Sequence, residues 1–157
     1  MTLDDLSANF AHLDRTTLLA DWSWLIGAGR LPVMLTMAGD LFVQDAGTGA
    51  VFFLDTVEGT CTHVAADGAD FQSLLTDRSF VADHFSFYLI APLLKAGRDL
   101  PPGKLWGWVT PPVLGGEIDA NNLEPTDIEV HFSILGQIWK QVKDLPPGTT
   151  INNVKIE

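Results

Sequence analysis

The 157-residue chain has little cysteine and no long apolar run. Its single cysteine, Cys61, excludes an intramolecular disulfide and is typical of a reducing compartment. No apolar run approaches the roughly 18 residues that a membrane span needs. The opening MTLDDLSANF lacks the basic and apolar regions of a secretory signal. We therefore expect a cytoplasmic protein that does not contact a membrane.

Basic residues are also scarce. Nine Lys and Arg stand against 20 Asp and Glu, which gives a formal net charge of −11. Proteins bind phosphate backbones through Lys and Arg patches, so this balance argues against nucleic acid as a partner. It favours a partner with a basic surface, because opposite fields accelerate encounter. The alternative, that the acidity only keeps the chain soluble, stays open.

Motifs for metals and nucleophiles are missing as well. None of the four histidines, His12, His63, His84 and His131, has the spacing of a metal ligand, and no nucleophile elbow occurs. Cys61 and His63 share one face of an expected strand, but a small core residue is the simpler interpretation of Cys61. We expect no metal, no cofactor and no catalytic residue.

Length and composition indicate one domain over residues 1–157, with 1–13 peripheral and the richest motifs in 104–150. Apolar periodicity and turn residues predict four helices, at 14–26, 70–75, 77–95 and 133–144. The same signals predict six strands, at 33–37, 41–44, 50–55, 60–64, 104–110 and 126–132. This order predicts an α+β fold with a mostly antiparallel sheet of about six strands and helices packed on one face.

The expected strand 126–132 alternates between apolar and polar residues. Its inward positions would be Ile128, Val130 and Phe132, and its other face would carry Asp127, Glu129 and His131. Carboxylates and an imidazole at this spacing can act as an acid–base group or hold an ion. A solvated outer face requires the same residue types, and this simpler interpretation is preferred.

A cluster of acidic residues without an intervening Lys or Arg marks the candidate partner-binding surface. Its members are Glu117, Asp119, Glu124, Asp127 and Glu129, with His131 beside them. Part of the cluster lies on the long loop 111–125, and loops of this length often carry function. Trp106 and Trp108 flank a glycine on one strand, which is typical either of a binding surface or of a core.

Residues 111–146 also carry a family resemblance. Its motifs are Pro111-Pro112, Leu114-Gly115-Gly116-Glu117, Asn122, Asp127-Ile128-Glu129-Val130-His131, Gly136-Gln137-Ile138 and Gln141-Val142-Lys143-Asp144-Leu145-Pro146. An upstream echo, Gly39-Asp40-Leu41-Phe42 and Phe53-Leu54-Asp55, extends the resemblance to about 15–150. The segment resembles the C-terminal module of immunity proteins against type VI secretion DNase effectors, and the fold is similar to SUKH-type immunity proteins.

The resemblance implies a non-enzymatic, cytoplasmic immunity-type protein that neutralises a basic, nuclease-type toxin by occluding it. Such a protein would be a monomer or a weak homodimer. Longer relatives carry an N-terminal domain before this module, whereas only about 30 residues precede it here. The alternative, a small-ligand binding module or an unrecognised enzyme, would use the Asp127/Glu129/His131 face and the 111–125 loop.

Overall fold

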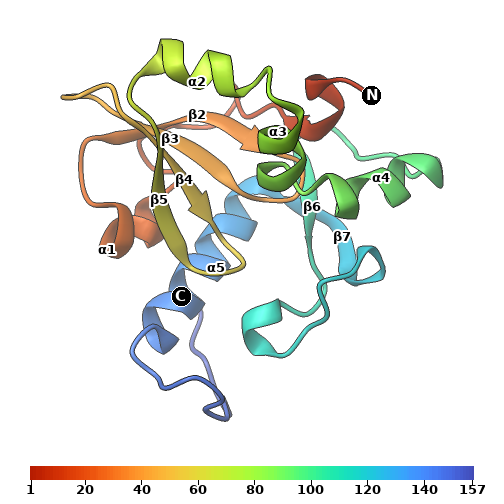
Figure 1. Ribbon diagram of the computed structural model, residues 1–157. Coiled ribbons are helices and arrows are strands. Elements are labelled where there is room, and N and C mark those ends of the chain that lie inside the picture. The colour runs from red at the N-terminus through yellow and green to blue at the C-terminus, as the bar shows by residue number, and fades with distance from the viewer.

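The computed structural model describes residues 1–157 and shows the expected α+β architecture (Figure 1). Its strands are β1 (Ser7–Ala8), β2 (Arg30–Thr36), β3 (Leu41–Asp45), β4 (Val51–Asp55), β5 (Thr60–Ala65), β6 (Lys104–Trp108) and β7 (Leu123–Asp127). Its α-helices are α1 (Ser23–Ile26), α2 (Gly68–Leu74), α3 (Arg78–His84), α4 (Phe87–Lys95) and α5 (Ile128–Val142). Short 3-10 turns lie at Leu3–Leu6, Ala20–Trp22, Pro112–Leu114 and Ala120–Asn122.

The predicted meander of four strands is confirmed. Strands β2 to β5 pair in sequence order, each antiparallel to the next, and their bounds differ from the prediction by a few residues. Phe42 stands opposite Phe53, and Leu41 stands opposite Leu54. Because neighbouring strand residues face opposite sides, the two phenylalanines line one face of the sheet and the two leucines line the other.

The remaining strands do not extend this sheet. β6 and β7 form a separate two-stranded ladder, so the expected six strands are divided between two sheets. The edge of β2 is already occupied by β1, which pairs through Ser7 and Ala8. Only one backbone bond joins the two sheets, from the Trp106 amide to the Met37 carbonyl at 2.8 Å. The polar sequence around Ser7 gave no sign of this edge strand.

The predicted strand 126–132 is wrong. β7 ends at Asp127, and α5 begins at Ile128 and runs to Val142. The buried positions Ile128, Phe132, Leu135, Ile138 and Val142 are three or four residues apart, which is the period of a helix. Ile128 and Phe132 alone fit either a strand or a helix. The later buried residues Leu135, Ile138 and Val142 fit only the helix.

The predicted helix 77–95 begins as expected, with the Asp77 side chain accepting the amides of Ser79 and Phe80, but it divides into α3 and α4. Ser86 lies between them with a left-handed φ of 52°. Phe85 and Ile90 are both fully buried. Five residues on a continuous helix rotate the chain by about 140°, so the break allows both side chains to reach the core. The predicted helix 14–26 is likewise shorter, with turns before α1.

One cluster of 28 buried hydrophobic residues draws on both sheets and on the helices. Near its centre the Phe42 ring lies 4.9 Å from Phe53, 4.8 Å from Phe71 of α2 and 5.5 Å from Phe85. Figure 1 shows α5 running behind the five-stranded sheet, with the β6–β7 ladder beside it. The 111–125 loop continues from the Trp108 end of the ladder, and α5 begins at its opposite end, beside Lys104.

Candidate functional site

The 111–125 loop has a defined shape because Asn122 clamps its two ends. The Asn122 amide donates to the carbonyls of Thr110 at 2.7 Å and Glu117 at 2.8 Å, and its oxygen accepts from the Thr110 amide at 2.9 Å. Gly116 lies so close to the Thr110 carbonyl that a Cβ atom there would collide with it. Asn122 and the Gly115-Gly116 pair therefore fix a loop rather than bind a ligand directly.

Beside these hydrogen bonds lies an open hollow of about 500 Å³, which we call the loop hollow. Glu117 and Asp119 line it, and both are exposed. The Asp119 side chain also accepts the Asn121 amide at 2.8 Å, which orders the turn that follows. The first two predicted acidic residues thus lie together around one cavity.

Glu124 and Asp127 lie on β7 and are exposed. Asp127 stands opposite Lys104 in the ladder, and the Lys104 Nζ atom is 2.9 Å from its carboxylate. The sequence interpretation missed this pair because Lys104 precedes the acidic cluster by 13 residues. Asp127 is consequently partly neutralised, whereas Glu124 makes no ion pair.

Glu129 lies in the first turn of α5 and lines a second hollow, of about 380 Å³, together with His12, Asp14 and Asp21. We call this the α5 hollow. The Asp21 carboxylate accepts a hydrogen bond of 2.7 Å from the Ser133 hydroxyl. Sequence reasoning did not connect Asp14 and Asp21 with Glu129, because the packing of α5 on the chain near Trp22 joins segments more than 100 residues apart.

His131 is not on the surface, contrary to the prediction. It is 4% exposed, and its Nε2 donates to the Gly39 carbonyl at 2.8 Å. Burial lowers the pKa of His131 to about 4, so the ring is neutral near pH 7. Asp127, Glu129 and His131 therefore share no face, and the acid–base or ion-binding group considered from the sequence does not form.

Trp106 and Trp108 are both buried, so neither presents its ring to a partner in the free protein. Trp106 lies beneath the guanidinium of Arg98, at 4.7 Å from the ring centre. Trp108 is the last residue of β6 and lies beside α5. Its indole nitrogen is buried without a hydrogen-bond partner. Of the two alternatives, a binding surface or a core, the structure places both tryptophans in the core.

A buried polar network links the hairpins to α5, and it involves Asp40. One Asp40 oxygen accepts from the Thr56 amide at 2.8 Å and from its hydroxyl at 3.0 Å. The Thr56 carbonyl in turn accepts the Trp139 indole at 3.0 Å. Burial, with the nearby charge of Asp55, raises the pKa of Asp40 to about 8.

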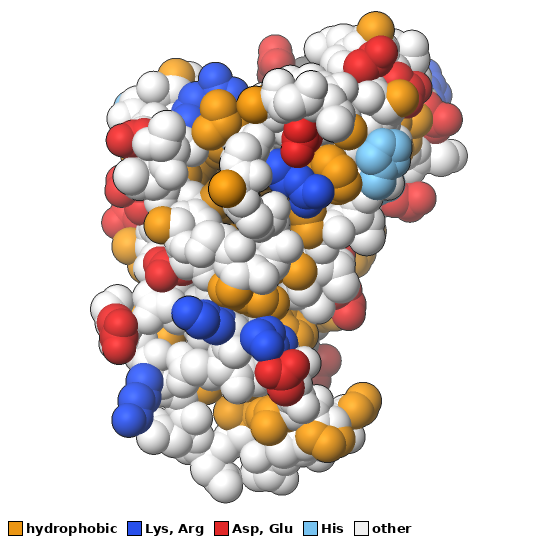
Figure 2. Space-filling model, turned by 90° about the vertical axis from the view of Figure 1, so that its left-hand side faces the viewer, with side chains coloured by type: hydrophobic (Ala, Val, Ile, Leu, Met, Phe, Trp, Pro, Cys, Tyr) orange, Lys and Arg blue, Asp and Glu red, His pale blue; other side chains and the backbone are white.

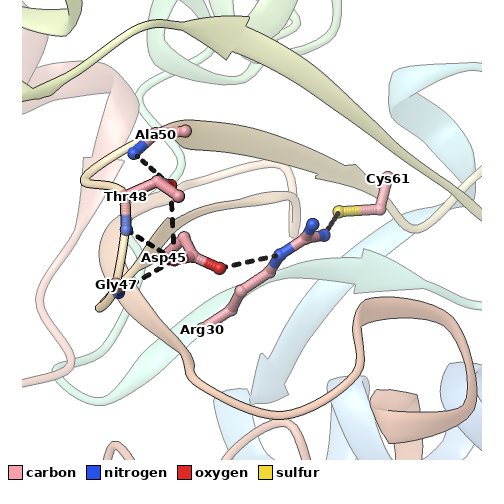
Figure 3. Close-up of polar contacts among 6 residues, drawn as sticks. All are labelled: Arg30, Asp45, Gly47, Thr48, Ala50 and Cys61. Atoms are coloured by element: carbon pink, nitrogen blue, oxygen red, sulfur yellow. Dashed lines mark hydrogen bonds and ion pairs between the residues drawn. The ribbon is translucent and has the colours of Figure 1, made fainter.

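Cys61 is half-buried on β5 rather than in the core, and Arg30 approaches it (Figure 3). The guanidinium of Arg30 lies 3.8 Å from the sulfur, 4.0 Å from Asp45 and 3.6 Å from the centre of the Phe52 ring. Burial raises the pKa of the Cys61 thiol above its ordinary value, against the opposing effect of Arg30. The thiol therefore stays protonated near neutral pH and is no activated nucleophile.

No group of three or more His, Cys, Asp or Glu side chains is placed to hold a metal ion. None of the helices is both long enough and apolar enough to cross a bilayer. On the face drawn in Figure 2, basic and acidic side chains are mixed from top to bottom. Of the predicted acidic surface, Glu117 and Asp119 line the loop hollow and Glu129 lines the α5 hollow, whereas Glu124 and Asp127 lie on β7 outside both.

Residues 65–139 match a known protein family. It is the T6SS immunity protein Tdi1, C-terminal family. The match covers just under half of the chain, from the end of β5 to the later part of α5. It confirms the resemblance to type VI secretion immunity proteins over a shorter segment than the expected 15–150. No curated protein matches the chain.

The matched segment contains all of the predicted acidic residues, Glu117, Asp119, Glu124, Asp127 and Glu129. It also contains Gly116 and Asn122, which shape the loop. Asp14 and Asp21 lie outside it. Most of the candidate surface is thus built from the part of the chain that is similar to the Tdi1 C-terminal family, and the earlier segment completes one of its hollows.

Proposed function

We propose that this chain is an immunity protein that binds and neutralises a toxin delivered by a type VI secretion system. The observation that carries the proposal is the family match over residues 65–139. Members of an immunity family act by binding, so we also propose that the chain has no catalytic activity of its own.

The charge distribution supports a finer proposal about the toxin. A nuclease carries a basic cleft that attracts the phosphate backbone of its substrate. Carboxylates around the loop hollow and the α5 hollow would compete for such a cleft. We therefore propose a basic, nuclease-type toxin, occluded in the cytoplasm by a single folded domain that is monomeric or weakly dimeric.

The alternative of a small-ligand site or an enzyme has less structural support than the immunity role. It required Asp127, Glu129 and His131 on one strand face, and His131 is instead buried against Gly39. The loop hollow, which this alternative would also use, is open and polar, whereas small-molecule sites are mostly apolar clefts that enclose their ligand.

The test uses the effector toxin domain encoded beside the gene for this chain. Expressed alone in a sensitive bacterium, that domain should stop growth, and co-expression of this chain should restore it. In vitro, one equivalent of the purified chain should form a stable complex and abolish DNA cleavage. Growth arrest that persists despite normal levels of the folded chain would contradict the immunity role. Rescue without inhibition of DNA cleavage would contradict only the nuclease proposal.

A further inference from the structure

A small cleft lies between the β6–β7 ladder and α5, and the sequence gave no sign of it. Its volume is about 60 Å³. Its lining includes Trp108, Pro111, Thr126, Val130, His131 and Ile134. We call it the β6–α5 cleft. Small-molecule pockets are several times larger, roughly 300–1,000 Å³, so this cleft has room for one side chain and not for a cofactor.

Trp108, one of the residues that line the cleft, carries an unsatisfied hydrogen-bond donor. Trp108 is 8% exposed, and its Nε1 is the only buried side-chain nitrogen or oxygen in the protein without a partner. Three other indoles, those of Trp22, Trp24 and Trp139, donate to backbone carbonyls at 2.9, 3.3 and 3.0 Å. A buried N–H group without an acceptor costs about 1–3 kcal/mol, so an acceptor supplied by a partner would be stabilising.

The rim of the cleft is apolar and accessible. Val130 is 44% exposed although it lies on the otherwise well-packed α5. Val109, which follows Trp108 in the chain, is 57% exposed and lines the loop hollow. The buried centre of a protein interface is more apolar than its rim, so an accessible apolar surface between charged groups suits that position.

Acidic groups lie on both sides of this apolar rim. Thr110 lines the loop hollow with Glu117 and Asp119, and the next residue, Pro111, lines the cleft. Glu129 lines the α5 hollow, and the next residue, Val130, lines the cleft. The cleft is therefore the apolar centre between two acidic flanks. These flanks favour a partner with a basic surface. They also favour a neutral carbonyl as the acceptor for the indole, because Glu117, Asp119 and Glu129 would repel a carboxylate.

We propose that the β6–α5 cleft is the anchor pocket for the toxin, and this rests on the proposed immunity function. It would take one small aliphatic side chain from a toxin segment. Because the Trp108 indole nitrogen has almost no exposed surface in the free protein, the cleft would open locally on binding and let a backbone carbonyl of that segment accept the N–H. Lys or Arg side chains on either side of that segment would enter the loop hollow and the α5 hollow. The cleft holds the partner once bound, whereas the acidic flanks attract it.

The division of roles can be measured by binding kinetics with the immobilised toxin domain encoded beside the gene. Val130→Gln removes the apolar rim, and Trp108→Phe removes the indole donor while keeping an aromatic ring. Each should accelerate dissociation roughly tenfold and leave the association rate within about twofold. The matched control is Leu94→Gln, a change of the same kind at a helical residue that is 38% exposed on α4. It should dissociate like the parent.

Val130 is exposed, so its variant keeps the test valid even if Trp108→Phe folds poorly. Dissociation of Val130→Gln at the parent rate would overturn the anchor pocket and leave the immunity function intact. A parent chain that does not bind the toxin domain would overturn the proposed function and this inference with it.

Nitrogen–proton NMR spectra supply a second readout. The chain has five tryptophans, and Trp108→Phe identifies the Trp108 indole signal by its loss. Complex formation should move that signal downfield, because its N–H gains an acceptor, while the signals of Trp22 and Trp139 should move little. An unchanged Trp108 signal in the saturated complex would mean that the donor is satisfied only by water, and it would overturn the proposal.

Discussion

Asp40 and His131 are the two titratable side chains that the fold buries, and their protonation is shifted in opposite ways. Burial first and the charge of Asp55 second raise the pKa of Asp40 from 3.8 to about 8. Burial lowers the pKa of His131 from 6.5 to about 4. Both groups are therefore uncharged in the folded protein near pH 7, which suits a network that connects hairpins to α5 without contact with water.

Stability should fall as pH rises from about 6.5 to 8, because of Asp40. Since its folded pKa is above its unfolded value, the folded chain holds one more proton in this range, and the stabilisation present at low pH is lost as pH rises toward 8. His131 has the opposite effect, because its lowered pKa makes stability rise with pH, but only between about pH 4 and 6.5. Asp40→Asn keeps an oxygen that can accept the Thr56 amide and removes the titration.

The measurement is the free energy of unfolding in urea for the parent and Asp40→Asn at several pH values. The advantage of the variant should grow by about 1 kcal/mol per pH unit between pH 6.5 and 8. Parallel stability profiles for the two proteins would contradict the raised pKa of Asp40.

At the scale of elements, the sequence was sufficient where a pattern was local and regular. The meander β2 to β5 followed from short apolar runs separated by glycine and aspartate turns. The Asp77 cap and the end of α1 at Gly27 were also visible, the latter with a left-handed φ of 72°. These features depend on residues close together in the chain.

Features that depend on contacts between distant parts of the chain could not be predicted from the sequence. Ile128 and Phe132 can share a face in a strand or in a helix, whereas Val130 joins them only in a strand. The contacts of α5 with Trp22 and with Gly39 decide for the helix. The same packing buried His131 and brought Asp14 and Asp21 beside Glu129. The acidic residues of the candidate site were predictable because they lie close together in sequence. The placement of Glu117 and Asp119 in one hollow and of Glu129 in another was not.

A pair of alanine variants tests the helical assignment of α5. A strand would bury Val130, whereas the helix leaves it 44% exposed and buries Leu135. Val130→Ala should change the free energy of unfolding by no more than about 0.5 kcal/mol, since it leaves no cavity. Leu135→Ala should cost roughly 2–5 kcal/mol, because it opens one. Chemical denaturation measures both, and a large loss for Val130→Ala would restore the strand interpretation.

At the scale of the whole molecule, the net charge of −11 is not spread evenly. Acidic and basic side chains are mixed on the face drawn in Figure 2, whereas the loop hollow and the α5 hollow are lined by carboxylates and by no Lys or Arg. Lys104 neutralises part of Asp127, so Glu124 and Glu129 are the better members of the cluster for a test. The local potential beside β7 and α5 should accelerate encounter with a basic toxin more than it strengthens the final complex.

The association rate with the toxin domain encoded beside the gene tests this account most directly. The test variant combines Glu124→Lys and Glu129→Lys. The control combines Glu58→Lys and Asp83→Lys, which make the same charge change at exposed residues on the β4–β5 hairpin and on α3. At low salt the test variant should associate several-fold more slowly than the control, and the difference should vanish at high salt. Equal association rates for the two variants at low salt would contradict an acidic docking surface at β7 and α5.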